Sequence, residues 1–491
     1  MPKSPPVSGK PSICIIGAGF GGIGLAIRLL EAGYDDLTIV EKADAVGGVW
    51  RDNIYPGLTC DVPSHLYSFS FEPNHDWTRR FPRREEIHSY LERCAAKYGL
   101  DRHLRLSTEV ERAEFDEVAG AWRVQTRAGE EIVADVLVSA TGQLSRPADP
   151  AIPGLGEFDG PVFHSGRWDS EVELPGRRAA VIGAGASAVQ FVPEIAGTVE
   201  RLEIFQRSPN YVVPKPDRPY RPRERTLFRR FPWIQSLSRA WAFLRFEYAI
   251  LIFTRLTLIR RLYEHGYRMR LRREVPDPAL RRKLQPDYPI GCKRVLISND
   301  WLPALSRSNV SVVSEPIREI TAAGILTADG VEHEADVLIL GTGFAANDFL
   351  APMEVRGLGG RDLNEAWRDG AEAYLGLTVN GFPNMFILYG PNTNLGAGSI
   401  VFMLESQINY VVESVRALER TNARWIDVRA EVQGAFNADV QEGLADTVWT
   451  AGCTSWYRTE SGKVTNNWPG LQLEYRRRTR KPDLADYTVA S

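Results

Sequence analysis

The sequence predicts an α/β chain with two dinucleotide-binding domains, because two different motifs each occur twice along its 491 residues. The first is a short β-branched run followed by a glycine turn, at Gly17, Gly19 and Gly22 and again at Gly183, Gly185 and Ala188. The second is an apolar run that ends in Ala-Thr-Gly at 140–142 and in Gly-Thr-Gly at 341–343. A strand, a glycine turn and a helix form the phosphate-binding unit of a Rossmann-like fold. Each copy therefore predicts one such fold.

Prolines and glycines between residues 147 and 156 indicate the first domain boundary. We expect residues 1–11 to be a disordered lead-in, 12–146 to belong to the first nucleotide domain and 147–334 to form the second. The sequence indicates a second break near the Gly-Thr-Gly motif, and we therefore treat residues 335–491 as a separate portion of the chain. From the residues alone, the topology of that portion stays open.

An insertion is expected at about 213–290, because the two motifs are more widely spaced in the second copy. Residues 221–273 contain fourteen arginines and three glutamates, interleaved with tryptophan, phenylalanine and leucine. This pattern is typical of amphipathic helices. Such helices would either cap the second nucleotide domain or make peripheral contact with a membrane surface or a lipid substrate.

The composition is that of a globular protein, with 44% hydrophobic residues, a formal net charge of −3 and a pI near 6.3. This balance provides no global attraction to nucleic acid. No run approaches the roughly 20 apolar residues of a membrane-spanning helix. The five cysteines have no paired spacing, so we expect neither a disulfide scaffold nor a metal site. A reducing, cytoplasmic location fits this pattern best.

The first glycine turn predicts an FAD site. Glu41 follows the next strand and lies 24 residues after Gly17, where a carboxylate can accept hydrogen bonds from ribose hydroxyls. Backbone N–H groups at the start of the following helix can meet a pyrophosphate. An acidic residue at this position favours an unphosphorylated ribose, which suits FAD.

The second glycine turn predicts an NADPH site. The same offset of 24 residues from Gly183 reaches Arg207 instead of an acid, and Ser208 follows it. A guanidinium can bind a 2′-phosphate through charge-assisted hydrogen bonds, whereas a carboxylate would repel it. The pair of turns therefore indicates one flavin and one phosphorylated nicotinamide cofactor.

Two longer strings resemble signatures of a known enzyme family. The stretch from Phe158 to Asp169 fits F-x-G-x-x-x-H-x-x-x-W-[P/D], and the stretch from Gly47 to Asp61 fits [A/G]-G-x-W-x-x-x-x-[F/Y]-P-[G/M]-x-x-x-D. Both are similar to fingerprints of the Baeyer-Villiger monooxygenases, flavoenzymes that use NADPH and molecular oxygen to convert ketones to esters or lactones. The resemblance extends from Ile13 to about Tyr487 and implies that residues 335–491 complete the FAD domain.

The resemblance implies catalytic roles for Arg294 and Asp61. Gly291, Cys292, Lys293 and Arg294 are similar to the family's G-[C/T]-K-R segment. A flavin peroxide attacks a ketone only as its anion, and a permanently charged guanidinium can stabilise that anion and the oxyanion that follows. Asp61 would orient Arg294, while Lys293 would reach the NADPH phosphate. Without the family context, Asp61 would be a solvated loop acid and the Lys-Arg pair a solvated strand end.

The family pattern also implies a set of cofactor contacts. For FAD they are Gly17, Gly19, Phe20, Gly22, Glu41, Val49, Trp50, Asp61, Tyr67 and Val110; for NADPH they are Gly183, Gly185, Ser187, Ala188, Gln190, Arg207, Ser208 and Lys293. Trp468 is expected either beside the nicotinamide or ketone, or in the core. His164 is expected to couple domain rotation to cofactor position, with direct proton transfer as the alternative.

Two other functions stay open at this point. A flavin-containing monooxygenase that oxidises nitrogen or sulfur shares the same cofactors, but its fingerprint carries Tyr or Phe where this chain has Trp168. A nucleotide-binding redox sensor would keep both folds but would not need Asp61, Lys293 and Arg294 together. The expected partners are therefore a small-molecule ketone and oxygen, and the sequence leaves the particular ketone open.

Overall fold

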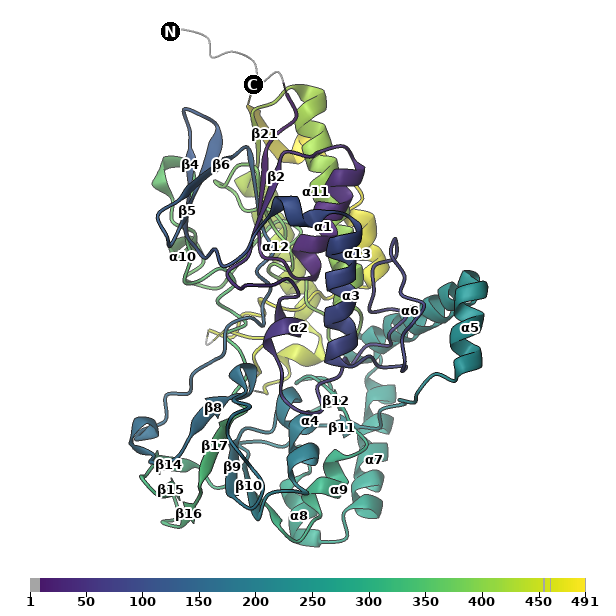
Figure 1. Ribbon diagram of the computed structural model, residues 1–491, viewed down its shortest axis with the longest axis vertical. Helices are drawn as coiled ribbons and strands as arrows, with labels where there is room; N and C mark the ends of the chain where they lie inside the picture. Colours follow the sequence, from purple (N-terminus) through teal and green to yellow (C-terminus); the bar gives the residue numbers. More distant parts are fainter. Residues whose placement is uncertain (1–8, 454, 460, 491) are drawn as a thin grey trace.

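The computed structural model describes residues 9–453, 455–459 and 461–490. Figure 1 shows two α/β units stacked along the long axis of the molecule, with a group of helices at one side. Most of the predicted lead-in at residues 1–11 lies outside the described residues. Each unit is built on its own parallel sheet.

The first unit contains a five-stranded parallel sheet in the order β19-β7-β1-β2-β3. Its strands are β1 (Ile13–Ile16), β2 (Leu37–Val40), β3 (Leu104–Arg105), β7 (Val136–Ser139) and β19 (Met385–Ile387). Every residue of β1 is buried, because helices cover one face of this sheet and a second sheet covers the other. The helices are α1 (Phe20–Glu31), α3 (Arg84–Lys97) and α11 (Ile400–Thr421). The second sheet runs β18-β4-β5-β6, with β4 (Val110–Asp116), β5 (Ala121–Thr126), β6 (Glu131–Ala134) and β18 (Glu354–Arg356).

The second unit repeats this plan with the parallel sheet β13-β10-β9-β17-β8. Its strands are β8 (Val162–His164), β9 (Arg178–Ile182), β10 (Arg201–Phe205), β13 (Val310–Val313) and β17 (Val337–Leu340). Helices α4 (Ala186–Ile195) and α9 (Trp301–Leu305) pack on one face. The antiparallel strands β14 (Ile317–Ile320), β15 (Gly324–Thr327) and β16 (Glu332–Glu334) contribute to the core on the other.

The repeated motifs meet in the same way in both units. Gly17 and Gly183 both adopt φ +107°, a conformation that L side chains rarely adopt. A Cβ on Gly17 would lie 2.6 Å from the carbonyl oxygen of Ala140, and one on Gly183 would lie 2.4 Å from that of Gly341. Each glycine turn therefore packs against the end of the strand that carries the second motif, which explains why the two motifs occur together. The predicted fold class, two Rossmann-like units in an α/β chain, is confirmed.

Two antiparallel segments connect the units. Residue Ala148 donates its backbone N–H to the carbonyl of Gly343, and Ala345 donates to the carbonyl of Arg146. Because β17 pairs with β8 and β9, the chain leaves the second sheet only after Leu340. The predicted boundary at 335 is therefore too early: the strand that precedes the crossing still belongs to the second sheet. Strand β19 then pairs with β7, so the later residues return to the first unit.

The predicted insertion folds into four helices: α5 (Pro222–Arg230), α6 (Pro232–Thr254), α7 (Thr257–Glu274) and α8 (Pro278–Lys283). The short parallel strands β11 (Val212–Val213) and β12 (Leu296–Ile297) pair at its base. In Figure 1, α5 and α6 lie at the edge of the molecule beside the first unit, while α7 and α8 lie along the second. No helix within the described residues has a long enough apolar stretch to cross a bilayer.

The C-terminal residues pack on the first unit. They form α10 (Leu363–Ala366), β20 (Trp425–Val428), α12 (Ala430–Ala445), α13 (Gln472–Arg478) and β21 (Tyr487–Ala490). Helix α13 packs against α11, and β20 pairs with β21. The short helix α2 (Val49–Asp52) lies between the two units in Figure 1. Its position brings the second half of the Gly47 to Asp61 signature toward the junction.

Candidate active site

An ion pair between Arg294 and Asp61 lies where the two units meet. Arg294 precedes β12 of the insertion, whereas Asp61 follows α2 of the first unit. The Nη2 atom of Arg294 donates to Oδ2 of Asp61 at 3.2 Å. The structure thus brings together two residues that are 233 positions apart in the chain. This pairing is the one that the two signatures predict.

The electrostatics of this pair keep the arginine charged. Burial disfavours the charge, but attraction to Asp61 raises the pKa of Arg294 above its ordinary value. The arginine side chain still keeps 40% of its surface accessible, so its guanidinium can meet a ligand. Burial also raises the pKa of Tyr457 to about 12 and that of Tyr389 further, so both phenols stay neutral. A single fixed cation therefore faces this part of the site.

The other carboxylate oxygen of Asp61, Oδ1, accepts no hydrogen bond from the described residues. This oxygen is also buried. A buried carboxylate oxygen without a donor costs free energy, and such atoms are rare in native proteins. The site is thus complete only when a bound group or a water supplies that donor.

Tyr389 is a site residue that the sequence reasoning did not single out. It adopts φ +62°, a sparsely populated conformation for a tyrosine, and its hydroxyl donates to Oδ1 of Asn394 at 2.7 Å. Its backbone is held by Gln407, which accepts from its N–H, and by Gln143, which donates to its carbonyl. The backbone conformation of Tyr389 and its position near Arg294 appear only in three dimensions. A local pattern could not have identified it.

Aromatic side chains from the first unit line the flavin side of the junction. Trp50 donates its Nε1 hydrogen to the hydroxyl of Tyr67 at 3.1 Å, and the rings meet edge to face at 5.5 Å. Phe20, at the start of α1, packs edge-on against Tyr67 at 5.2 Å. Val49 begins α2 directly before Trp50. The structure therefore gathers four of the residues expected to contact the flavin.

Glu41 joins the first glycine turn to the following segment. Its Oε2 atom accepts from the N–H of Ala18 at 2.8 Å, and Oε1 accepts from Ala43 at 3.0 Å. Oε1 also lies 3.3 Å from Nη1 of Arg51. Since a carboxylate has about four acceptor positions, the remaining capacity for ribose hydroxyls lies mainly on Oε2. Residues 107 and 108 hydrogen bond back to Ala43 and Glu41, which holds the start of β4 at Val110 nearby. These contacts fit the adenosine end of a dinucleotide.

The second glycine turn faces a cluster of positive charge. Ser187 and Ala188 lie in the first turn of α4, behind Gly185. Arg207 is exposed at the end of β10 and makes no salt bridge within the described residues. Lys293 donates to the hydroxyl of Ser208, and burial together with the charge of Arg207 lowers the pKa of Lys293. The positive charges of Arg207 and Lys293 repel each other, and the hydroxyl of Ser208 lies beside them. A phosphate would neutralise both charges, so these residues form a site suited to a phosphate.

Gln190 joins the two units. Its Oε1 atom accepts from the N–H of Thr59 at 3.2 Å and from the Tyr55 hydroxyl at 3.4 Å, while Nε2 donates to the Thr59 carbonyl at 3.0 Å. These bonds attach α4 of the second unit to the signature loop of the first. The contact of Gln190 with NADPH stays a prediction, and Nε2 keeps a second N–H with which it could be made.

Trp468 lies in the core, which is one of the two positions expected for it. Only 3% of its surface is exposed, its ring packs between Phe436 and Tyr475, and its Nε1 donates to the carbonyl of Leu471. Residues 466–467 instead bond within the C-terminal segment, where Asn467 accepts from Asn394. The core alternative is the one that the structure supports.

His164 lies beside the crossing between the units. It ends β8, its Nδ1 accepts from Gly166 at 2.9 Å, and its ring meets Phe344 edge-on at 5.6 Å. Burial lowers the pKa of His164, and its Nε2 atom has no partner among the described residues. Trp168 packs on Phe163 and Phe191. The fingerprint lines a surface pocket that does not include Arg294, so direct proton transfer from His164 at Arg294 has no geometric support.

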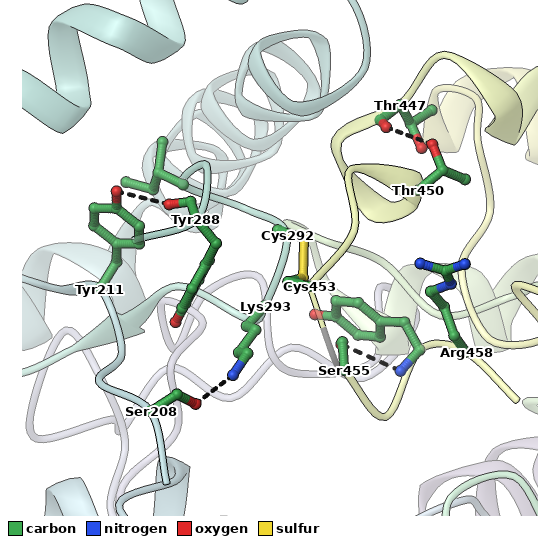
Figure 2. The surroundings of a disulfide bond; sticks show 12 residues. Ser208, Tyr211, Tyr288, Cys292, Lys293, Thr447, Thr450, Cys453, Ser455 and Arg458 are labelled. Carbon is green, nitrogen blue, oxygen red and sulfur yellow. Dashed lines mark hydrogen bonds between the residues drawn. A yellow bond between two sulfur atoms is a disulfide. The ribbon is translucent and has the colours of Figure 1, made fainter. Parts of the chain in front are cut away.

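A disulfide corrects the expectation from the cysteine spacing. Cys292 and Cys453 are bonded although 161 positions separate them, with their Cα atoms 6.2 Å apart. Figure 2 shows that this bond attaches the loop of Lys293 to the C-terminal segment that precedes Tyr457. Cys14, Cys60 and Cys94 are free and buried. The expectation failed because spacing reports only local pairing, whereas this pair forms through the tertiary fold.

Comparisons with known proteins identify the family. The family model described as flavin-binding monooxygenase-like matches residues 10–353. A Baeyer-Villiger monooxygenase of Pseudomonas aeruginosa is 46% identical over 481 residues, which cover 98% of this chain and 91% of that protein. The closed crystal structure of cyclohexanone monooxygenase superposes with a TM-score of 0.88 at 29% identity, over 98% of this chain and 99% of that one. The structure of OTEMO in complex with FAD and NADP has the same TM-score at 26% identity, over 99% of this chain and 100% of that one. The chain belongs to the flavin-binding monooxygenase-like family and, within it, to the Baeyer-Villiger monooxygenases.

Proposed function

We propose that this protein uses NADPH and oxygen to convert a ketone to an ester or lactone, with FAD bound to the first unit and NADPH to the second. The relatives named as Baeyer-Villiger monooxygenases support this reaction, and they do not favour the alternative of nitrogen or sulfur oxidation. The observation that carries the proposal is the fixed charge of Arg294 beside Asp61 at the junction of the two nucleotide folds.

The residues of the first unit fit a bound flavin. We assign the pyrophosphate to the turn of Gly17, Gly19 and Gly22, and a ribose to the free acceptor positions of Glu41. Trp50 and Tyr67 would lie against the ring system. The unpartnered Oδ1 of Asp61 needs a donor from a bound group or water. When bound, FAD accepts a hydride from NADPH and then supplies activated oxygen for insertion next to a carbonyl carbon.

The residues of the second unit would select and hold NADPH. Arg207 and Lys293 supply two positive charges with Ser208 between them, so a 2′-phosphate would relieve their mutual repulsion. NADH carries no group there and would leave the two cations unneutralised. This arrangement favours the phosphorylated cofactor.

Arg294 would act where negative charge develops during oxygen insertion. Its guanidinium is already charged, oriented by Asp61 and partly accessible, so little reorganisation is needed when an oxyanion forms beside it. Asp61 is therefore a positioning residue for Arg294. Tyr389 and Tyr457 stay neutral near the guanidinium, so neither adds a charge to the site.

The proposal is tested with the purified, FAD-loaded protein. NADPH consumption under air should increase when a ketone is added, and mass spectrometry should detect a product that has gained one oxygen atom. Since one structural relative is a cyclohexanone monooxygenase, cyclic ketones are the first class to test, followed by aryl, long-chain and steroid ketones. NADPH consumption that yields only hydrogen peroxide with every ketone would contradict the proposal.

We place the enzyme in the cytoplasm, where NADPH is supplied. The free thiols of Cys14, Cys60 and Cys94 fit a reducing compartment, whereas the disulfide between Cys292 and Cys453 is of a kind that is rare there. Peripheral contact with a membrane surface through the arginine-rich insertion is part of this proposal.

A further inference from the structure

Helix α6 carries apolar side chains on its outer face as well as on its inner face, where Gln235 and Glu247 are buried together with Ile250 and Ile252. The exposed apolar residues follow one face at helical spacing: Trp233 at 61% exposure, Leu237 at 61%, Trp241 at 66%, Leu244 at 56% and Tyr248 at 49%. The outer face of a surface helix in a globular protein is normally polar. Five large apolar side chains in one line therefore need an explanation; we call them the α6 stripe.

The opposite face of α6 is fixed to the first unit by polar contacts. Gln235 bonds to His75 and to the Asn74 carbonyl, Arg239 donates to the carbonyls of His65 and Ser68, and Glu247 accepts from Gln472. Phe243 adds an aromatic contact with Phe402 at 4.6 Å. These bonds determine the rotation of the helix about its axis. The α6 stripe is consequently held outward by the fold and does not result from a loosely packed helix.

The surface around the stripe is positively charged. Arg230 lies just before α6, Arg245 lies on the stripe face between Trp241 and Tyr248, and Arg255 follows the last residue of α6. All three arginines are exposed, and none forms a salt bridge or a side-chain hydrogen bond within the described part of the chain. Exposed arginines continue on α7 at Arg261 and Arg268.

The three glutamates of residues 221–273 do not neutralise this charge. Glu224 is bonded to Arg218, Glu247 to Gln472, and Glu264 accepts from the N–H of Ile290. Because each of these three carboxylates already has a partner within the fold, the outer surface of this segment keeps its arginine charge. The positive charge is local, since the whole chain carries a formal net charge of −3.

We propose that the α6 stripe docks on an anionic phospholipid surface, with α6 lying in the plane of the membrane interface. Tryptophan and tyrosine favour the headgroup level of a bilayer, leucine favours the acyl boundary, and arginines beside them are attracted to acidic lipids. A second copy of this chain would place the same arginines against each other and be repelled, whereas acidic lipid headgroups would neutralise them. The proposal specifies the peripheral contact given above, and it does not depend on the oxygenation chemistry.

Flotation of the full-length, FAD-loaded protein with vesicles tests this proposal. The protein should float with vesicles of phosphatidylcholine mixed with phosphatidylglycerol, bind vesicles of phosphatidylcholine alone at least about fivefold more weakly, and lose binding as salt is added. Failure to float with the acidic vesicles at low salt would overturn the proposal.

Two double variants separate the apolar and the charged contributions. The W233S/W241S variant should lower binding by about tenfold or more, and R230Q/R245Q should lower binding to the acidic vesicles by about twenty-five-fold, from roughly fivefold per arginine. The matched controls V118S and R420Q change an exposed valine and an exposed arginine on other elements and should bind like the wild type. Wild-type binding by W233S/W241S would contradict docking through the stripe.

Two further measurements keep the outcomes distinct. The double variants should retain bound FAD and wild-type NADPH oxidation with a water-soluble ketone, which shows that they are folded. If light scattering shows a dimer that W233S/W241S converts to a monomer, a second copy covers the stripe and the proposal is overturned. A protein that floats but does not oxidise ketones would contradict the proposed function and leave the docking surface intact.

Discussion

Replacement of Arg294 by alanine is expected to stop oxygen insertion while leaving reduction by NADPH intact. The guanidinium lies 3.2 Å from Asp61, a distance at which two unit charges attract by about 5 kcal/mol at an effective dielectric constant near 20. This attraction orients the guanidinium toward the site. Loss of one preorganised donor at a developing oxyanion typically lowers the rate by about 10² to 10³, or roughly 3 to 4 kcal/mol. We expect ester formation by R294A to decrease by that factor.

The reductive step should respond differently, because the phosphate cluster of Arg207, Ser208 and Lys293 stays in place. Anaerobic rapid mixing should show flavin reduction within about threefold of the wild type. R294K should recover only part of the oxygenation, because a lysine keeps the charge but loses the planar fork that meets two acceptors.

The assay compares the rate of anaerobic flavin bleaching with the product formed under air, for the wild type, R294A and R294K. R420A, which removes an exposed arginine at the end of α11, is the matched control and should behave like the wild type in both steps. A normal ester yield from R294A would refute the role assigned to the guanidinium. Equal loss of both steps would show that Arg294 supports the fold or NADPH binding and has no special role in oxygenation.

Three further predictions concern the cofactor, the disulfide and a buried acid. R207A should raise KM for NADPH by about tenfold to a hundredfold and change KM for NADH little, because the substitution removes a charge-assisted contact that only the 2′-phosphate can make. Equal effects on the two KM values in steady-state kinetics would contradict the phosphate site. Cys292 and Cys453 are 161 positions apart, so reduction of their bond should lower the free energy of unfolding by about 5 kcal/mol in the chain-entropy account. Denaturant titrations of the wild type with and without a thiol reductant should therefore differ. Titrations of C292A/C453A under the two conditions should coincide. Burial raises the pKa of Asp427 from 3.8 to about 6, so the folded state binds the proton of this carboxyl group more tightly than the unfolded state does. The protonated carboxyl group therefore stabilises the fold below pH 4, and this stabilisation is lost as the pH rises to 6. Relative to D427N, the wild type should therefore lose about 3 kcal/mol over that range, and parallel pH curves for the two proteins would exclude the effect.

The glycine turns and the amphipathic helices could be predicted from the sequence, because each depends on interactions among residues a few positions apart. A glycine turn after a buried strand fixes a conformation that other residues avoid, and both copies, at Gly17 and Gly183, adopt the same φ in the structure. The amphipathic helices of the insertion were predictable for the same reason. The pattern did not reveal that α6 presents an apolar face outward, because the contacts of Gln235, Arg239 and Glu247 with other elements determine that orientation.

Residues that meet across the fold depended on the tertiary structure. The resemblance to the family implied that Asp61 orients Arg294, and the structure shows the contact, with Nη2 of Arg294 3.2 Å from Oδ2 of Asp61. It also assigns Gln190 to the junction between the units, buries Trp468 and adds Tyr389 to the site. None of these outcomes has a local signal, because the partners are distant in sequence.

By itself, the sequence determined the α/β class, the two dinucleotide turns, the difference between Glu41 and Arg207, and the presence of a charged arginine in a family signature. Only the tertiary structure decided that Cys292 reaches Cys453, that β17 stays in the second sheet, and that the α6 stripe faces outward. The physical reason is the range of the forces involved. Backbone conformation and hydrophobic periodicity act over a few neighbouring residues, whereas pairing, burial and pKa depend on groups that folding brings together from distant parts of the chain.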